Sequence, residues 1–124
     1  MKIKEIPFVG YPVTDLNRSR EFYAGVLGLT ESFIVEFGEG NSQFWLEYNI
    51  GEGCLALSNG WPPHGSKGGP TMALEVDDLD KAMGELNTSG DHVDSQIMES
   101  PSCRFFLFHD PDGNPLCMHQ VKKA

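Results

Sequence analysis

The sequence lacks the long apolar segment that a membrane protein needs. Its longest uninterrupted apolar run is residues 105–108, whereas a helix needs roughly 20 apolar residues to span a bilayer. Neither an apolar signal region nor a small-residue cleavage site follows Met1. We therefore expect a soluble chain with no membrane partner and no secretory leader.

Basic residues are also scarce. The 124 residues include 9 Lys and Arg against 18 Asp and Glu, which gives a formal net charge of −9. Proteins that bind nucleic acid neutralise phosphates with clustered Lys and Arg, and the sequence has no such cluster. We expect no nucleic-acid partner, and an anionic membrane surface is disfavoured for the same reason.

Cysteine is sparse and occurs in an odd number. Cys54, Cys103 and Cys117 form no C-x-x-C pair, so neither a disulfide framework nor a Cys-rich zinc site is indicated. Free thiols are typical of a reducing compartment. The sequence therefore predicts a cytoplasmic protein.

Glycine and proline, in contrast, are frequent, and they divide the chain into short segments. Fourteen Gly and eight Pro punctuate it, while 40% hydrophobic and 22% charged residues are values of a globular domain. Asp15 and Asp78 stand where helix N-caps belong, and Gly28 and Gly90 where the two helices end. Residues 59–69 read as a Gly/Pro-rich linker. Short apolar runs between these signals predict strands at 4–13, 30–36, 43–48, 54–58, 71–76, 93–98, 103–108 and 116–121.

The order of elements before the linker repeats after it. Residues 13–16 (VTDL) resemble residues 76–79 (VDDL) at an offset of 63, and helix positions 16, 19 and 23 then fall on 79, 82 and 86. This predicts an α+β fold with two βαβββ units, 1–60 and 70–124, in one domain over 1–124. A chance likeness of two strand–helix junctions is the alternative.

Two motifs resemble those of a known family. Residues 11–23 (YPVTDLNRSREFY) with 26–29 (VLGL), and residues 108–116 (FHDPDGNPL) near the end, resemble the vicinal oxygen chelate superfamily. That group includes glyoxalase I, extradiol dioxygenases, and fosfomycin- and bleomycin-resistance proteins. The resemblance implies tandem βαβββ modules whose curled mixed sheets surround a cavity. It also implies a small organic molecule as ligand and a homodimer.

The same resemblance implies where a metal would be held. Family members place His seven residues before each helix-capping Asp and Glu on the last strand of each unit. In this sequence those positions fall on Phe8, Thr71, Ala56 and Cys117. Divalent ions need imidazole or carboxylate donors, and Phe8 and Ala56 have no donor atom. We therefore expect no metal and no other cofactor.

Alternation along the strands names the side chains that face the expected cavity. Glu75 and His119 are the cavity residues that can move protons near neutral pH, and they are the candidate catalytic residues. A solvated rim carboxylate and a half-exposed strand histidine are the structural alternatives. The candidate ligand-binding residues are Phe8, Ala56, Trp61, Thr71 and Cys117, with Trp61 placed to close over a flat ligand.

Other roles for these residues stay open at this point. Glu75, Cys117 and His119 could form a replacement metal site by ligand type, and Cys117 could be a nucleophile beside His119 or an inert buried thiol. Trp45 is expected in core packing or at a subunit interface. Arg104 could pair with an anionic ligand or with Glu99.

Three functions follow from this sequence. The first is metal-free binding of a small, largely apolar or planar molecule, as in proteins that sequester bleomycin. The second is a glyoxalase- or dioxygenase-like enzyme that uses Glu75 and His119 or a metal held by unexpected ligands. The third is a regulatory or interaction module, because one scaffold hosts many functions.

Overall fold

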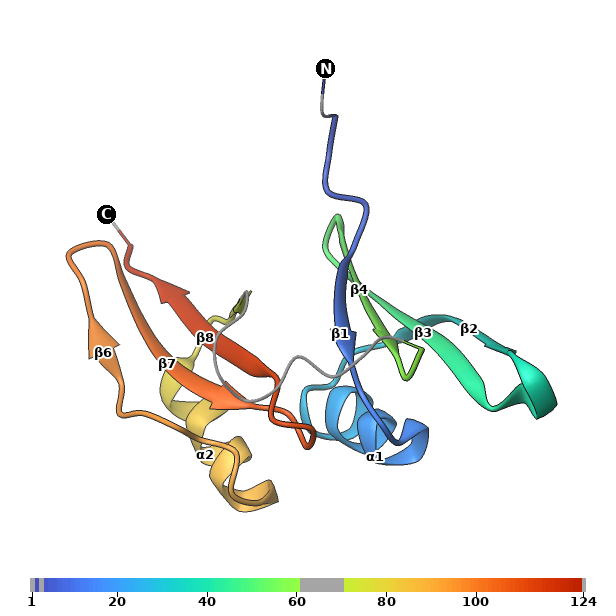
Figure 1. Cartoon of the computed structure of the whole chain (residues 1–124). Helices are drawn as coiled ribbons and strands as arrows, with labels where there is room; N and C mark the ends of the chain where they lie inside the picture. Colours follow the sequence, from blue (N-terminus) through green and yellow to red (C-terminus); the bar gives the residue numbers. More distant parts are fainter. Residues whose placement is uncertain (1, 3, 61–70, 124) are drawn as a thin grey trace. The chain divides into compact units, whose positions relative to one another are not determined.

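The computed structural model describes residues 2, 4–60 and 71–123. The chain divides into two compact units, Met1–His64 and Gly65–Ala124. Among the described residues each unit contains four strands and one principal helix, and each sheet has that helix against it (Figure 1). No helix in the described part of the chain is long and apolar enough to cross a membrane.

The first unit has the order βαβββ. Its strands are β1 (Val9–Pro12), β2 (Glu31–Phe37), β3 (Gln43–Ile50) and β4 (Gly53–Ser58), hydrogen-bonded in the order β1-β4-β3-β2. β1 and β4 are parallel, and the other pairs are antiparallel. A short 3₁₀ turn, η2 (Glu39–Asn41), connects β2 and β3.

The second unit repeats this architecture. Its strands are β5 (Met72–Glu75), β6 (Met98–Glu99), β7 (Cys103–His109) and β8 (Pro115–Val121), in the order β5-β8-β7-β6. β5 and β8 are parallel, as β1 and β4 are in the first unit. The predicted α+β fold of two βαβββ units with mixed sheets is therefore confirmed.

Equivalent hydrogen bonds set the register between the units. Val13 N donates to Ser58 O over 3.0 Å, and Val76 N donates to His119 O over 2.9 Å. The offset is therefore 63 for the first strands (76 − 13) and 61 for the last (119 − 58). The pairing of β3 and β7 fits the same repeat. Leu46 of β3 pairs with Leu57, and Phe106 of β7 pairs with Met118. The offset between these two strands is therefore 60 (106 − 46).

Both helices begin at the predicted aspartates. The carboxylate of Asp15 accepts a 3.0 Å hydrogen bond from Arg18 N, and that of Asp78 accepts one from Lys81 N over 3.0 Å. Such side chains satisfy an N–H group that the first helical turn leaves without a partner. The same capping chemistry therefore starts α1 (Leu16–Arg20) and α2 (Leu79–Ser89).

The helices end differently. α1 continues into a π-helical segment, η1 (Glu21–Val26), which stops before Gly28. Gly28 has a φ of +73°, a conformation that favours glycine, and Leu29 N beyond it donates to Tyr23 O. α2 is regular to Ser89 and is followed by Gly90.

Each sheet packs one face against its own helix. In the first unit Tyr23 stacks on Tyr48 of β3, with ring centroids 5.9 Å apart. In the second unit the backbone N–H of Leu79 at the start of α2 donates to the side chain of Gln120 on β8. The side chains on these helix-facing surfaces are nearly all buried, and they form the core: Tyr11, Phe44, Leu46, Tyr48, Leu55 and Leu57 in the first unit, and Phe106, Phe108, Leu116 and Met118 in the second.

Three strand predictions differ from the structure. Residues 4–8 precede β1 rather than belonging to it, and Thr71 precedes β5. The strand predicted at 93–98 is reduced to the two residues of β6 and one isolated bridge between Val93 and Phe108. At residues 94–96 the apolar alternation is broken by polar side chains, and the hydroxyl of Ser95 accepts a hydrogen bond from Leu107 N in place of a regular ladder.

Candidate functional site

Four of the candidate site residues, Ala56, Glu75, Cys117 and His119, lie on the faces of the sheets that are turned away from their own helices, here called the distal faces. The distal face of the first sheet includes Gly10, Pro12, Phe33, Val35, Phe37, Trp45, Glu47, Ala56 and Ser58. That of the second includes Ala73, Glu75, Cys103, Phe105, Leu107, Cys117, His119 and Val121. Cross-strand pairing places each set together, because directly paired residues point to one side of a sheet.

The distal face of the first sheet is apolar and aromatic. Phe33, Val35 and Phe37 follow one another at every second position of β2 and are 50%, 42% and 39% exposed. Trp45 on β3 pairs with Val35. Phe8, just before β1, meets the ring of Trp45 edge-on with centroids 5.2 Å apart. A continuous apolar surface therefore crosses this sheet.

The side chain of Glu47 brings a charged group to that surface. The carboxylate of Glu47 accepts a 2.6 Å hydrogen bond from Trp45 Nε1, which fixes the orientation of the indole ring. Burial raises the pKa of the nearby Cys54 thiol, and Glu47 raises it further by its charge and by a hydrogen bond. Glu47 therefore offers an acceptor within an otherwise apolar face.

Of the predicted ligand-binding residues in this unit, Phe8 is 40% exposed and Ala56 is fully buried. A molecule on this face would therefore meet the ring of Phe8 rather than the methyl group of Ala56. Phe44 is buried on the helix side of the sheet, and its neighbour Trp45 lies on the distal face. Trp61 lies outside the described residues.

The distal face of the second sheet carries the predicted proton-transfer pair. Glu75 and His119 are directly paired across β5 and β8, and His119 Nδ1 lies 2.6 Å from Glu75 Oε1. The other carboxylate oxygen, Oε2, accepts a 2.8 Å hydrogen bond from Val121 N. Both oxygens of Glu75 are thus engaged, and the imidazole ring is held in one orientation.

This geometry shifts both pKa values toward an ion pair. The hydrogen bond from Val121 N, then that from His119, lowers the pKa of Glu75. The hydrogen bond to Glu75 raises the pKa of His119. A raised histidine pKa favours the charged ring, which can donate a proton as a general acid, whereas the neutral ring can accept one as a base.

Of the remaining predicted residues of the second unit, Cys117 lies two residues before His119 on β8. Cys117 shares the distal face, is partly exposed, and has its pKa raised by burial and by Cys103. Thr71 is exposed. Sequence reasoning missed Cys103, whose thiol interacts with the imidazole of His119. The alternation of Cys103 with Phe105 and Leu107 along β7 is the sequence pattern that indicates its place on this face.

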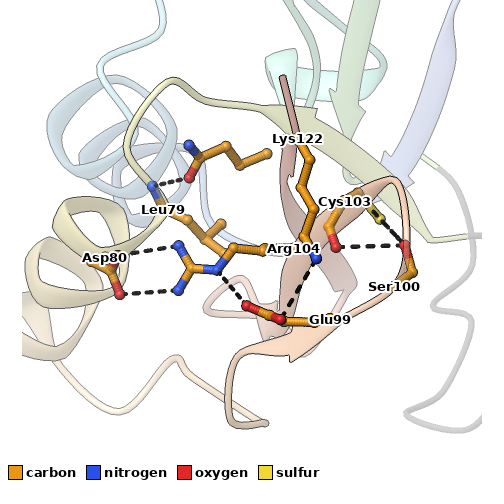
Figure 2. Close-up of polar contacts among 8 residues, drawn as sticks. Leu79, Asp80, Glu99, Ser100, Cys103, Arg104 and Lys122 are labelled. Carbon is orange, nitrogen blue, oxygen red and sulfur yellow. Dashed lines mark hydrogen bonds and ion pairs between the residues drawn. The ribbon is translucent and has the colours of Figure 1, made fainter. Parts of the chain in front are cut away.

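Arg104 is occupied by protein carboxylates. Its guanidinium lies 3.3 Å from Asp80 at the start of α2 and 3.3 Å from Glu99 on β6 (Figure 2). Lys122 also approaches Glu99, with Nζ 3.6 Å from Oε2. Of the two roles that the sequence left open for Arg104, the structure favours pairing with Glu99 over pairing with a ligand anion.

The donor groups do not fit the metal centre that the superfamily resemblance implies. Phe8 and Ala56 offer no lone pair, and Thr71 offers a neutral hydroxyl. Over the residues that the structure describes, no three His, Cys, Asp or Glu side chains are grouped so that they could hold a metal ion. A metal of this type requires such a donor set.

The turn between β7 and β8 is built on a buried aspartate. Asp110 is fully buried. Its carboxylate accepts hydrogen bonds from Asp112 N, Asn114 N and Asn114 Nδ2 over 2.9, 2.8 and 2.7 Å. The motif at 108–116 therefore determines the geometry of a turn, and it sets the register that brings His119 of β8 opposite Phe105 of β7.

Comparisons with known proteins agree with this architecture. TnmS3, an antibiotic binding protein from Streptomyces sp. CB03234, is 25% identical over 98% of this chain and 99% of its own, with a TM-score of 0.75. A glyoxalase/bleomycin resistance protein from the same organism is 27% identical over 90% and 96% of the two chains, with a TM-score of 0.69. The fosfomycin resistance protein FosX of Listeria monocytogenes shares the fold at 12% identity, with 98% and 96% covered and a TM-score of 0.74.

A comparison with curated proteins finds no significant match. The family model described as "Glyoxalase/Bleomycin resistance protein/Dioxygenase superfamily" matches residues 5–118. That span includes the first βαβββ unit, the second as far as the middle of β8, and both motifs on which the resemblance rested. The chain therefore belongs to the glyoxalase/bleomycin resistance protein/dioxygenase superfamily.

Proposed function

We propose that this chain binds a small, largely apolar or planar organic molecule without a metal ion. The observation that carries the proposal is the apolar distal face of the first sheet, on which Phe33, Val35 and Phe37 stay exposed beside Trp45. Exposed apolar surface of this kind marks sites of binding. Aromatic rings add stacking contacts to planar ligands.

The comparisons support the same function. TnmS3, which is described as an antibiotic binding protein, resembles this chain over nearly its whole length. The donor set gives separate support for the absence of a metal, because two of the four expected ligand positions are hydrocarbon side chains. Glu47, bonded to Trp45 Nε1, would supply the polar contact that orients a ligand.

A thermal-shift screen of aromatic and cationic small molecules tests this proposal. A ligand that binds only the folded state at about 100 times its Kd adds about 2.7 kcal/mol of stability, which raises the Tm of a chain this size by several degrees. If no compound raises the Tm, the proposal fails. Stoichiometric iron, manganese, nickel or zinc in protein purified without chelator would contradict the metal-free part.

A pair of variants on β2 locates the ligand. Val35 and Glu36 are neighbours and both are exposed, but they point to opposite faces of the sheet. We expect Val35→Gln to weaken a ligand found in the screen by about tenfold, because an apolar contact of about 1.4 kcal/mol is lost. The matched control Glu36→Gln should bind as the unaltered chain does. Equal affinities of the two variants for the ligand would show that the ligand does not bind to this face.

The pair formed by Glu75 and His119 favours a second candidate, an enzyme of the lyase or isomerase type. A carboxylate that orients an imidazole at 2.6 Å is a common arrangement for proton transfer. With a substrate identified by the same screen, Glu75→Gln and His119→Ala should abolish turnover but leave binding. Turnover that survives both substitutions would remove these residues from the mechanism.

We also propose a homodimer, as the superfamily resemblance implies. Size-exclusion chromatography with light scattering measures the mass in solution. A mass of one chain at micromolar concentration would contradict this part of the proposal.

A further inference from the structure

The side chains of Cys103, His119 and Glu75 form a connected series on the distal face of the second sheet. Phe105 pairs with His119 and Cys103 pairs with Val121, so Cys103 and His119 are diagonal neighbours on one face. The imidazole of His119 lowers the pKa of the Cys103 thiol, and the thiol raises the pKa of the imidazole. His119 is linked in turn to Glu75 at 2.6 Å.

The two ring nitrogens of His119 have different roles in this series. Because Glu75 is held as a carboxylate, it accepts a hydrogen bond from Nδ1–H. The neutral ring then carries its lone pair on Nε2, which is the nitrogen left for Cys103. A nucleophile, a base and a group that orients the base are the three parts of an activated thiol.

A second contact stabilises the thiolate. The hydroxyl of Ser100 lies 3.0 Å from Cys103 Sγ, and Figure 2 shows this contact at the turn between β6 and β7. The hydrogen bond from Ser100 and then that from His119 lower the pKa of Cys103, against an opposing effect of burial. Cys54 and Cys117 differ from it, because burial raises both of their pKa values.

The surroundings of the thiol are accessible and partly apolar. Cys103 is partly exposed. Leu107 and Val121 lie on the same face and are 40% and 57% exposed. Arg104, the next residue along β7, faces the other way: Figure 2 shows it directed toward Asp80 and Glu99, away from the Cys103 side chain.

From this arrangement we infer that Cys103 is a nucleophile, with His119 as its base and Glu75 as a positioning residue, and that it adds to α,β-unsaturated carbonyl compounds. His119 Nε2 takes the proton from Cys103 Sγ. The sulfur forms a bond to the β-carbon while the C=C π pair moves toward the carbonyl and gives an enolate. The imidazolium then returns the proton to the α-carbon.

Conjugate addition suits these residues because it requires only a thiolate and a proton donor. Every atom of the thiol and of the unsaturated carbonyl is retained in the adduct, so no oxidant or further reactant takes part. The apolar side chains of Leu107 and Val121 would contact the hydrocarbon part of such a compound. This inference does not depend on the ligand proposed for the first sheet.

The test compares the three cysteines within the intact, reduced chain. N-ethylmaleimide and cyclohexenone are conjugate acceptors, and mass spectrometry of peptides gives the rate at each cysteine. One unit of lowered pKa increases reactivity near neutral pH by only about threefold, because a weaker base is also a weaker nucleophile. With general-base assistance from His119, we expect Cys103 to react at least about fivefold faster than Cys54.

The variants separate the positioning residue from a merely structural one. Glu75→Gln keeps the size of the side chain and should reduce the rate at Cys103 several-fold and shift its pH–rate profile to higher pH, with the Cys54 rate unchanged. Glu75→Asp should restore part of the rate. The titratable groups that interact with Cys103 are His119 and Cys117, so Cys117→Ala is included and should leave the profile in place.

Three results would overturn the inference. The first is a Cys103 rate no greater than that of Cys54. The second is an unchanged profile in Glu75→Gln, which is informative even where His119→Ala does not fold. The third is fast reaction with iodoacetamide but slow reaction with both conjugate acceptors, which would mean that the thiol is nucleophilic without the proposed proton return. Ligand binding by the first sheet would be unaffected by any of the three.

Discussion

Equivalent positions on the two distal faces carry different chemistry. Where the second unit has Glu75, the first has Pro12, and where the second has His119, the first has Ser58. On the third strand of each unit the ionisable residue is in the first unit instead, because Glu47 stands where the second unit has Leu107. One scaffold thus presents an aromatic surface with a carboxylate in one unit and a titratable pair with a thiol in the other.

The helix-facing surfaces, in contrast, remain similar. Leu46 and Phe106 occupy equivalent positions, as do Tyr48 and Phe108, and all four are fully or almost fully buried. Close packing restricts these positions to apolar side chains of suitable volume. The distal positions lack that restriction, so the two units differ there.

The largest contrast in stability is expected at the turns before the last strands. The first unit joins β3 to β4 through Gly51 and Glu52, whereas the second uses a longer turn built on buried Asp110. Asp110→Ala leaves three hydrogen-bond donors without their acceptor and should cost about 2–4 kcal/mol. Glu52→Ala, on an exposed turn, should change the free energy of unfolding by less than about 0.5 kcal/mol. Urea denaturation measures both.

Similar losses in the free energy of unfolding of the two variants would mean that the buried turn contributes no more to stability than the exposed turn. Asp110→Asn keeps one oxygen as an acceptor and should lose less than Asp110→Ala. That order is a further check on the hydrogen-bond argument.

A smaller, pH-dependent contrast is expected from the Glu75–His119 pair. The lowered pKa of Glu75 adds stability above about pH 4.5, its ordinary pKa, which is lost as the pH falls through the folded value. The raised pKa of His119 adds stability below about pH 6.5, which is lost as the pH rises through the folded value. The pair therefore contributes fully between these two limits.

Because both side chains are partly exposed, we expect this contribution to stay below about 1 kcal/mol. Glu75→Gln should lower the pKa of His119 measured by NMR titration and should flatten the stability profile from mild acid to weak base. A His119 pKa that is unchanged in Glu75→Gln would contradict the ion pair. The first unit cannot contribute at the equivalent positions, because Pro12 and Ser58 do not titrate in this range.

The smallest effect is expected at Tyr48. Its hydroxyl is buried without a hydrogen-bond partner among the described residues, and burial raises its pKa to about 12. Tyr48→Phe installs the residue that the second unit has at Phe108. It removes a polar atom with no partner, so the free energy of unfolding should change by less than about 1 kcal/mol and should not fall.

The same substitution should remove a loss of stability in strong base. A raised tyrosine pKa favours the folded state fully below its ordinary value of about 10 and progressively less as the pH rises toward 12. A marked loss of stability at neutral pH in Tyr48→Phe would show that the hydroxyl has a partner after all. Chemical denaturation at neutral pH and above pH 10 distinguishes the two results.

The sequence predicted the fold well because its signals are local. Asp15 and Asp78 as caps, Gly28 at the end of the first helix, and the repeat at an offset of 63 all depend on neighbouring residues, and each is present in the structure. Alternation also placed Glu75 and His119 on one face, and the structure brings them together. The predicted strand at 93–98 was wrong in most of its length, because polar side chains there satisfy the backbone instead.

The candidate site was less predictable. The proximity of Cys103 to His119 depends on the antiparallel register of β7 and β8, which is set by the length of the turn around Asp110 and by no local pattern. The partner of Arg104 depends on how α2 crosses its sheet, because Asp80 is far from Arg104 in the sequence. The roles of Phe8, Ala56, Thr71 and Cys117 in ligand binding remain predictions.

The place of β2 at the end of its sheet has a consequence for how copies of the chain behave in solution. An edge strand has backbone N–H and C=O groups that can pair with a neighbouring molecule. The exposed side chains of Phe33, Val35 and Phe37 would add apolar contacts to such a pairing. The net charge of −9 keeps copies apart. Salt screens this repulsion, so we expect association along this strand to begin in concentrated samples of high ionic strength.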